Sequence, residues 1–377
     1  MDEFIFWASG VLIVYPYFGY PVLLYLLTVF SNNPVKRGLV QPPVTIIIAA
    51  YNEEQKIEDK IENTLSLNYP SEKKEIIVAS DGSTDRTNQI VSAYKDKGII
   101  LVVLPKHKGK ESAQWEAIKV ATKEILVFTD TSTMIERDSL LHIVSNFHDP
   151  TVGCVSSEDL VMTDKGESDG EGFYVKYEML LRRLESQVNS LVGLSGSFFA
   201  VRRELCREWS TDVDSDFITV FRALKKGFRA VSDPTVVGSY KTVSSPDREF
   251  NRKVRTVLRG ISGLACHIEV LNPFRHGLFS FQVMSHKLLR WLVPLFMVCF
   301  FVSNMMLIGN NPFYNWLFAA QVVFYFMSIL GLLIRKFSRN MLFKISAFYV
   351  LVNISIVVAW IKYFLGHRVT QWESSRK

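Results

Sequence analysis

Two stretches decide the fold class: Val-Thr-Ile-Ile-Ile-Ala-Ala-Tyr-Asn-Glu-Glu at residues 44–54 and Glu-Ile-Ile-Val-Ala-Ser-Asp-Gly-Ser-Thr-Asp at residues 75–85. In both, a short apolar run rich in β-branched residues ends directly in polar and acidic residues. A near-continuous apolar run of this kind predicts a strand buried on both faces, as parallel sheets require. The residues between the two runs follow a helical period, so the sequence predicts a strand, a helix and a second, parallel strand.

The same alternation continues to about residue 150 and predicts an α/β fold with a doubly wound, mostly parallel sheet. The expected strands are Val44–Ala50, Glu75–Ser80, Ile99–Leu104 and Ile125–Thr129, and the expected helices are Glu53–Leu67, Asp85–Lys97 and Lys110–Thr122. Asn52, with Gln55 three residues later, and Asp85 are expected to cap helices. After residue 150 we expect an apolar run at Val152–Val161, a mobile loop at Thr163–Gly172 and a long helix at Phe173–Val192.

Both ends of the chain are apolar, which predicts membrane-spanning helices. Hydrophobic residues make up 48% of the chain and charged residues 21%, yet Phe4–Phe30 contains no charged residue. A helix of that length exceeds the roughly 30 Å of hydrocarbon it must cross, so we expect tilt or a kink at Pro16 or Pro21. The chain begins with acidic rather than basic residues, which favours an uncleaved anchor over a signal peptide. Three further spans are expected at Leu288–Ile308, Pro312–Ile334 and Leu342–Leu365.

Basic residues near the expected spans indicate the orientation. Lys36 and Arg37 follow the first span, and three basic residues separate the last two, namely Arg335, Lys336 and Arg339. The positive-inside rule therefore places the central region in the cytoplasm, at an inner or plasma membrane. The basic tail after the fourth span contradicts this count, which leaves two alternatives: the last segment re-enters the membrane, or it lies in the interface.

Composition and motifs exclude several classes of protein. The formal net charge of +6 suits an anionic membrane or substrate, and no nucleic-acid motif is present, so we expect membrane lipids and no nucleic acid as partners. The four cysteines form no paired metal-ligand spacing and are expected to be reduced. Neither a Gly-x-Gly-x-x-Gly turn nor a Walker A loop follows the first strand, which argues against dinucleotide oxidoreductases and P-loop phosphotransferases. The oligomeric state stays open.

The chemistry is expected where the strands end, because ligands of open parallel sheets bind beyond the carboxyl ends of the strands. The residues that follow the four strands are Tyr51–Glu54, Asp81–Asp85, Lys106–Lys110 and Asp130–Ser132. Taken alone, each stretch is an ordinary turn, solvated loop or helix cap. Together they place carboxylates beside lysines at one edge, which suits a nucleotide diphosphate with a divalent metal, Mg²⁺ or Mn²⁺.

At these residues the sequence resembles glycosyltransferase family 2, the inverting enzymes with a nucleotide-sugar-binding sheet of the GT-A type. The resemblance runs from about Pro42 to Gly260. It rests on Tyr-Asn-Glu-Glu at 51–54, Ser-Asp-Gly-Ser-Thr-Asp at 80–85, Lys-Gly-Lys at 108–110, Phe-Thr-Asp at 128–130, Ser-Gly-Ser at 195–197 and Asp-Ser-Asp-Phe at 214–217.

The resemblance implies roles for individual residues. Tyr51, Glu53 and Asp81 would hold the nucleoside, with Asp81 facing the base. Lys110 would lie near the donor, and Asp130 would be the metal carboxylate. Family members commonly have two aspartates flanking one residue here, whereas this chain has Asp-Thr-Ser at 130–132.

Asp216 stands where the family carries its general base, at the start of a helix expected from Phe217 to Lys226. An inverting transfer needs one carboxylate to take the proton from the acceptor hydroxyl as that hydroxyl attacks the anomeric carbon. The alternatives are that Asp216 only caps the helix, or that Asp212 or Asp214 is the base.

Four arginines share one face of an expected helix, because they recur at intervals of four, three and four: Arg248, Arg252, Arg255 and Arg259. Such a face binds an anion, which is the donor diphosphate, a pyrophosphate-linked lipid acceptor or a lipid headgroup. The resemblance favours the diphosphate for Arg252 and Arg255. It also suggests that Trp372 and Arg376 contact the active-site face.

These observations predict an inverting glycosyltransferase that moves a sugar, expected from a UDP-sugar, to a lipid-linked or polysaccharide acceptor. The expected parts are a membrane anchor at 1–33, a nucleotide-sugar-binding half at 42–150, an acceptor-binding half with the base at 151–262, an interfacial segment at 263–287, about three membrane helices at 288–366 and a tail at 367–377. Two alternatives remain: a nucleotidyltransferase, which needs a triphosphate loop after the first strand, and a catalytically inert sensor of nucleotide or lipid.

Overall fold

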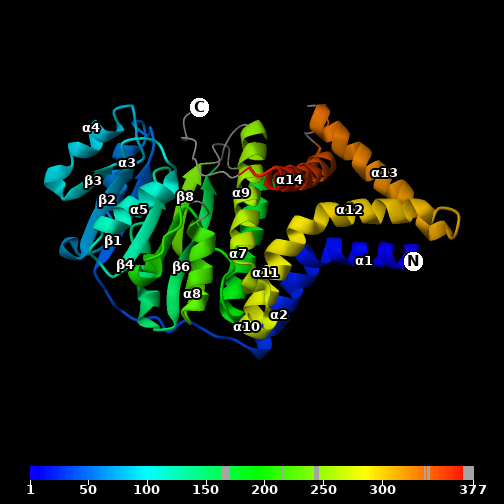
Figure 1. The fold of residues 1–377 in the computed structure, drawn as a ribbon, viewed down its shortest axis with the longest axis horizontal. Coiled ribbons are helices and arrows are strands. Elements are labelled where there is room, and N and C mark those ends of the chain that lie inside the picture. The colour runs from blue at the N-terminus through cyan, green and yellow to red at the C-terminus, as the bar shows by residue number, and fades with distance from the viewer. Residues whose placement is uncertain are drawn as a thin grey trace. The chain divides into compact units, whose positions relative to one another are not determined.

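A computed structural model describes residues 1–162, 170–211, 213, 215–241, 246–334, 337 and 340–367. Several predictions fall outside these residues: most of the loop predicted at 163–172, Asp212 and Asp214 as substitute bases, the basic residues 335, 336 and 339, and the tail residues Trp372 and Arg376. Residues 170–172 of that loop are helical instead, because the following helix begins at Gly170. The chain divides into two compact units (Figure 1). The membrane unit comprises Met1–Leu26, Val243–Ser262 and Ile268–Arg368, and the sheet unit comprises Leu27–Thr242, Gly263–His267 and Val369–Lys377.

The sheet unit is built on one eight-stranded sheet with the order β3-β2-β1-β4-β7-β6-β8-β5. Its strands are β1 Val44–Ala50, β2 Lys74–Ser80, β3 Ile99–Val103, β4 Ile125–Asp130, β5 Met134–Ile135, β6 Val152–Met162, β7 Phe198–Arg202 and β8 Arg229–Lys241. The pairs β3/β2, β2/β1 and β1/β4 are parallel, which confirms the predicted α/β sheet. Beyond β4 the sheet is mixed, because β7 runs antiparallel to both β4 and β6 and β5 runs antiparallel to β8, whereas β6 and β8 are parallel.

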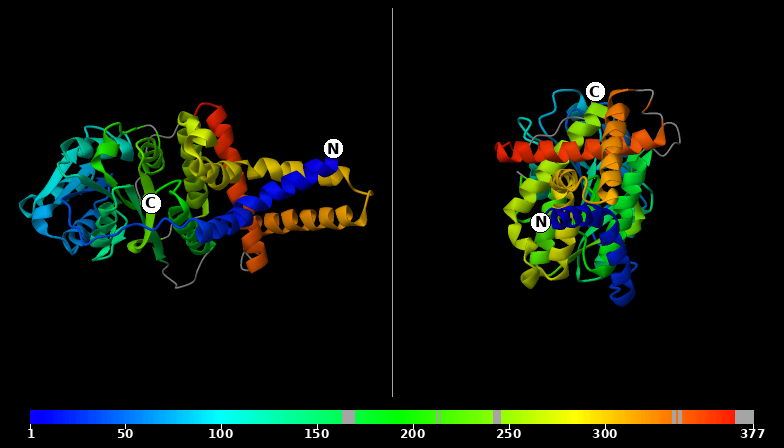
Figure 2. Two further views of the ribbon diagram at one scale, coloured as in Figure 1. Left: turned by 90° about the horizontal axis from the view of Figure 1, so that it is seen from below. Right: turned by 90° about the vertical axis from the view of Figure 1, so that its right-hand side faces the viewer.

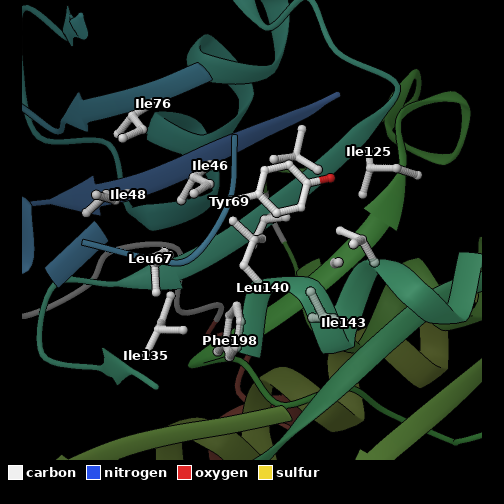
Figure 3. Close-up of a cluster of buried hydrophobic side chains, with 14 of the residues drawn as sticks. Ile46, Ile48, Leu67, Tyr69, Ile76, Ile125, Ile135, Leu140, Ile143 and Phe198 are labelled. Carbon is white, nitrogen blue, oxygen red and sulfur yellow. The ribbon is translucent and has the colours of Figure 1, made fainter. Parts of the chain in front are cut away.

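Burial explains why the parallel half forms. All seven residues of β1 are buried, and Ile46, Ile48 and Ile76 meet Leu140 and Phe198 in a continuous core (Figure 3). Each isoleucine removed from water in this way contributes about 1.5–3 kcal/mol. The helices of this unit are α3 Ile57–Leu65, α4 Thr87–Ser92, α5 Lys110–Val120, α6 Ser139–Ser145, α7 Gly170–Val188 and α8 Ser215–Lys225.

The predicted cap at Asn52 is wrong. Asn52 adopts a left-handed conformation with φ 52°, and its side-chain oxygen accepts a hydrogen bond from the N–H of Thr84 at 2.8 Å. The side chain therefore ties two loops together instead of closing a helix, and α3 begins only at Ile57. The predicted cap at Asp85 is one residue early, because Arg86 holds the cap position of α4. The Asp85 side chain still accepts a hydrogen bond from the N–H of Thr87, the first residue of that helix, at 3.0 Å.

Within the described part of the chain, four helical segments are long and apolar enough to cross a membrane: Asp2–Phe30, Leu278–Met306, Pro312–Leu333 and Met341–Phe364. All of them belong to the membrane unit except residues 27–30, which the sheet unit contains. The first consists of α1 Asp2–Val14, a π-helical turn Tyr15–Gly19 with Pro16, and α2 Tyr20–Phe30. The second joins α11 Leu278–Val283, a π-helical turn Met284–Leu288 and α12 Leu289–Met306. It therefore begins ten residues before the predicted start at Leu288. The last two are α13 Pro312–Leu333 and α14 Met341–Phe364.

Aromatic contacts hold α1 against α12 and α13. The Phe6 ring stacks on Phe300 at a centroid distance of 4.7 Å and meets Tyr314 edge-on at 5.2 Å. Trp360 of α14 donates a hydrogen bond to the carbonyl of Trp291 in α12 at 2.9 Å. Figure 2 shows α1 and α12 side by side, with α14 lying across α12. Helix α9 runs from Pro246 to Cys266, and its residues 246–262 belong to the membrane unit. The short helix α10 Pro273–His276 lies in the same unit.

Candidate active site

The site lies where the strand order reverses. β2 and β3 extend to one side of β1 and β4 lies on the other, so the loops after β1 and β4 border the position where open α/β sheets bind ligands. The loops after β1 and β2 are bonded to each other: Ser83 Oγ accepts from the N–H of Asn52 at 3.1 Å, and Asp85 Oδ2 accepts from the N–H of Glu54 at 3.2 Å. This edge is therefore fixed before any ligand binds.

Asp81, predicted to face the base, is completely buried at the end of β2. Its Oδ1 accepts from the N–H of Lys108 at 2.8 Å, and its Oδ2 accepts from the N–H of Gly109 at 2.7 Å. His107 Nδ1 lies 2.7 Å from the same Oδ2. The loop after β3 is thus anchored on this carboxylate.

Tyr51 and Glu53 flank Asp81 in different ways. The Tyr51 ring is half-buried and lies flat on the His107 imidazole, with centroids 3.8 Å apart and planes inclined by 13°. Glu53 is 2% exposed, and its N–H donates to Thr87 Oγ1 at 2.9 Å. The aromatic face of Tyr51 is therefore packed against His107, whereas Glu53 belongs to the buried base of the loop.

Lys110 joins the other predicted residues. Its ammonium forms an ion pair with Asp130 and donates to the carbonyl of Gly196 at 2.9 Å. A Cβ atom added at Gly196 would lie 2.6 Å from Asp216 Oδ2, so the base candidate borders the same backbone. The structure thus brings Lys110, Asp130 and Asp216 together around one glycine, from α5, β4 and α8.

Electrostatics keep Lys110 charged. Burial alone would lower its pKa, but the carboxylate of Asp130 outweighs burial and the pKa is raised, with further support from Glu111 and Asp216. The Lys110 side chain is 15% exposed and that of Asp130 is 26% exposed. A fixed cation with partial access to solvent suits an anionic group such as a phosphate.

A buried polar network, which the sequence did not reveal, positions the segment Ser195–Ser197. Asp159 Oδ1 accepts from Ser195 Oγ at 2.6 Å and from Ser197 Oγ at 2.7 Å. Arg182 lies 3.8 Å from the other carboxylate oxygen and donates to the carbonyl of Leu194 at 3.3 Å. One feature of the sequence could have indicated this network: Asp159 interrupts the apolar run that forms β6. A carboxylate in such a strand requires hydrogen-bond partners.

The residues present fit a divalent metal only if a bound phosphate ligand supplies most of the oxygens around the ion. Among the described residues, no group of three or more histidines, cysteines or carboxylates could hold a metal ion. Asp130 is a single carboxylate, and Mg²⁺ bound through one or two carboxylates takes its remaining oxygens from substrate phosphates and water.

Arg252 and Arg255 belong to the part of α9 that lies in the membrane unit, and so does Arg259. The predicted helix is confirmed, and these three arginines lie on it. Arg248 lies in the same helix, but its side chain is outside the described part. Their role toward a diphosphate remains a prediction.

The fold is of the GT-A type, the class of α/β fold on which nucleotide-sugar-dependent transferases are built. Residues 45–210 match the model of glycosyl transferase family 2, and the chain carries a domain of this family.

Similar proteins come from bacteria and an archaeon. The poly-beta-1,6-N-acetyl-D-glucosamine synthase of Staphylococcus aureus strain COL is 30% identical over 200 residues, which cover 51% of this chain and 48% of that protein. The synthase of the same name from Staphylococcus epidermidis is 28% identical over 203 residues, covering 52% and 47%. The chain therefore spans about half the length of the curated relatives it matches.

A solved structure resembles nearly the whole chain. The mannosyltransferase PcManGT from Pyrobaculum calidifontis, in complex with GDP-Man and Mn²⁺, superposes with a TM-score of 0.72 and covers 95% of this chain and 99% of its own. Sequence identity is 23%, so the likeness concerns the fold.

Proposed function

We propose that this protein is an inverting glycosyltransferase that moves a sugar from a nucleotide sugar to a lipid-linked or polysaccharide acceptor at the cytoplasmic face of a membrane. One observation carries the proposal: Lys110 binds Asp130 and the carbonyl of Gly196, and Gly196 borders Asp216. A diphosphate anchor and a proton acceptor therefore lie within one small region, which an inverting displacement requires.

The roles follow from the chemistry of the side chains. Asp216 is half-buried and sits in the first turn of α8, where its carboxylate can take the proton of an acceptor hydroxyl. Lys110 offsets the negative charge that develops on the leaving diphosphate. Because the acceptor attacks from the side opposite the diphosphate, no covalent intermediate on the enzyme is needed.

Asp130 is proposed as the one protein carboxylate that holds a divalent metal, Mg²⁺ or Mn²⁺. Such an ion supplies Lewis-acid stabilisation of the departing diphosphate. The pairing of Asp130 with Lys110 supports this proposal, because a cation already lies against that carboxylate. Further support comes from the archaeal structure of the same fold, which is described in complex with Mn²⁺.

A UDP-sugar is proposed as the donor and a growing polysaccharide or lipid-linked sugar as the acceptor. The names of the staphylococcal relatives describe synthases of a polymer of N-acetylglucosamine, which supports this substrate class. The described apolar helices that can span a bilayer would keep an amphiphilic acceptor at the membrane. The basic residues Lys36 and Arg37 after the first helix support a cytoplasmic position.

The test compares purified full-length protein with Asp216→Asn. Radiolabelled UDP- and GDP-sugars are offered with membrane lipid extract and oligosaccharide acceptors, with and without Mn²⁺. We expect metal-dependent product that falls about 10²–10⁴-fold in the variant, as loss of a general base does. Asp96→Asn, which removes an exposed carboxylate from the same unit, serves as the matched control and should transfer sugar normally.

Two outcomes contradict the proposal. Equal product from wild type and Asp216→Asn removes Asp216 as the base. Binding of UDP without consumption of any donor supports an inert nucleotide sensor instead.

A further inference from the structure

The His107 side chain contacts Tyr51 and Asp81, two of the residues proposed to hold the nucleobase. Its ring is parallel to the ring of Tyr51 at 3.8 Å, a separation that leaves no space for a second ring between them. Base stacking on an aromatic side chain uses this same face-to-face geometry. The face that Tyr51 offers to a nucleobase is therefore covered by a side chain of the protein itself.

The same imidazole also contacts the carboxylate of Asp81. Asp81 is 0% exposed, and its Oδ2 is contacted by His107 Nδ1 at 2.7 Å. A planar ring whose nitrogen lies 2.7 Å from a carboxylate oxygen occupies the position that a nucleobase edge with an N–H donor would take. His107 thus makes both contacts, stacking and polar, that a base would make with Tyr51 and Asp81.

The loop backbone and the ring are held independently. The N–H groups of Lys108 and Gly109 bond to Asp81, and Gly82 accepts the close approach of the loop, since a Cβ there would lie 2.5 Å from the backbone nitrogen of His107. Gly82 has φ 68°, which favours glycine. Rotation of the side chain alone can therefore move the imidazole while the loop backbone stays bonded to Asp81. The His107 side chain is 20% exposed, so it can turn toward solvent.

We infer that His107 is an internal ligand of the nucleobase site, which occupies the faces of Tyr51 and Asp81 until a nucleoside diphosphate displaces it. This inference rests on the proposed function, because it takes Tyr51 and Asp81 as the base contacts. The internal ligand keeps the two side chains in place without nucleotide, and it reduces the apparent affinity for nucleotide by the fraction of molecules in which the site is open.

The first test is nucleotide binding to the full-length protein in detergent, measured by titration calorimetry with UDP and GDP. His107→Ala is expected to bind the nucleoside diphosphate several-fold more tightly than wild type, because the competing ring is gone. His107→Phe, which can still stack on Tyr51 but has no nitrogen for Asp81, should fall between them. Lys106→Ala is the matched control in the same loop, with an exposed side chain, and should not bind more tightly.

Inorganic pyrophosphate separates the base site from the phosphate site. It has no base, so its affinity should be the same in wild type and His107→Ala. Equal or weaker nucleoside diphosphate binding in His107→Ala overturns the inference, and so does a matching gain for pyrophosphate. If neither protein binds any nucleoside diphosphate, the proposed function fails and the inference fails with it.

A measurement on the wild-type protein covers the case in which the variants do not fold. In protein labelled with ¹³C at histidine Cε1, the His107 resonance is expected to carry the ring-current shift of Tyr51 and to lose it when UDP is added. A His107 resonance that stays unchanged at saturating UDP overturns the inference.

Discussion

Lys110 is the residue on which the charge balance of the site depends. Its ammonium neutralises Asp130, and its raised pKa keeps it protonated throughout the physiological range. Under the proposed function, loss of this ammonium would leave the carboxylates of Asp130 and Asp216 beside the leaving diphosphate without the Lys110 charge to balance them. Hydrogen bonds to charged groups contribute about 1.5–3 kcal/mol each.

We therefore expect Lys110→Met to lower the transfer rate from a UDP-sugar by about 10–100-fold, in line with that range. The measurement is initial-rate transfer at fixed Mn²⁺. Lys108→Met removes an exposed lysine two residues away and should leave the rate within twofold. A similar loss in both variants would show that only the general positive potential of the loop matters.

Lys60 is a second lysine with an unusual environment. It is fully buried on α3, where its ammonium donates to Thr129 Oγ1 at 2.9 Å and to the carbonyl of Thr133 at 2.5 Å. Burial lowers its pKa to about 7, although Asp130 acts in the opposite direction. In the unfolded chain the pKa is the ordinary 10.5, so between these values the unfolded state binds more protons than the folded state.

The free energy of unfolding should therefore rise with pH between about 7 and 10, by up to about 1.4 kcal/mol per pH unit from this group. Below pH 7 the cost of charging Lys60 is present in full. The check is thermal unfolding of wild type and Lys60→Met from pH 6 to pH 10. The variant should lose this slope, whereas Lys95→Met, at an exposed site, should keep it. Parallel curves for wild type and Lys60→Met would mean that the folded pKa is near normal.

At the scale of elements, β6 holds the segment Ser195–Ser197, which borders the proposed catalytic residues. Asp159 holds the hydroxyls of Ser195 and Ser197, and the carbonyl of Ser197 accepts from the N–H of Asp130 at 3.0 Å. A shift of this segment would move Gly196 relative to both Lys110 and Asp216. Asp159 is thus a positioning residue that acts through the Ser195–Ser197 segment.

Asp159→Asn should lower kcat for transfer by about tenfold, because misplaced catalytic groups are costly even without lost contacts. The affinity for UDP should stay within twofold, since Tyr51 and Asp81 belong to other loops. Glu158→Gln is the control: it removes the neighbouring carboxylate, which pairs with Arg183, and should leave kcat near wild type. A parallel loss of UDP affinity in Asp159→Asn would indicate general disruption of the unit.

Prediction from sequence was most accurate for the parallel strands, whose formation depends mainly on burial of apolar side chains. The strands β1 to β4 begin and end within one residue of the predicted positions, because buried apolar runs have few alternatives. The helix start at Asn52 was wrong, because a tertiary hydrogen bond to the loop after β2 overrides a local capping pattern. The stacking of His107 on Tyr51 and the bonds of Asp159 to Ser195 and Ser197 join segments 36 or more residues apart along the chain, and no local spacing reveals which residues meet.

At the scale of the whole molecule, the charge of the tail contradicts a count of four membrane spans, because four spans would place the basic tail outside the cell. The arrangement of helices in the membrane unit bears on this contradiction. α1 and α12 run side by side, whereas α14 lies across α12 (Figure 2). If α12 crosses the bilayer, a helix lying across it follows the membrane surface. We therefore expect α14 to lie in the interface, which would leave three crossings and place the basic tail on the cytoplasmic side.

Depth measurements distinguish an interfacial α14 from a spanning one. Nitroxide labels are placed singly at Leu342, Ile354 and Phe364, which are exposed on α14, in a cysteine-free background reconstituted into lipid vesicles. An interfacial helix gives three similar, shallow depths by oxygen and nickel accessibility, because all its turns lie at one level. Labels at the exposed positions Phe313, Val323 and Leu333 of α13 provide the reference, in which the middle position should be the deepest. A label at Ile354 that is as deep as the one at Val323 would show that α14 spans the bilayer, and the basic tail would then lie outside despite its charge.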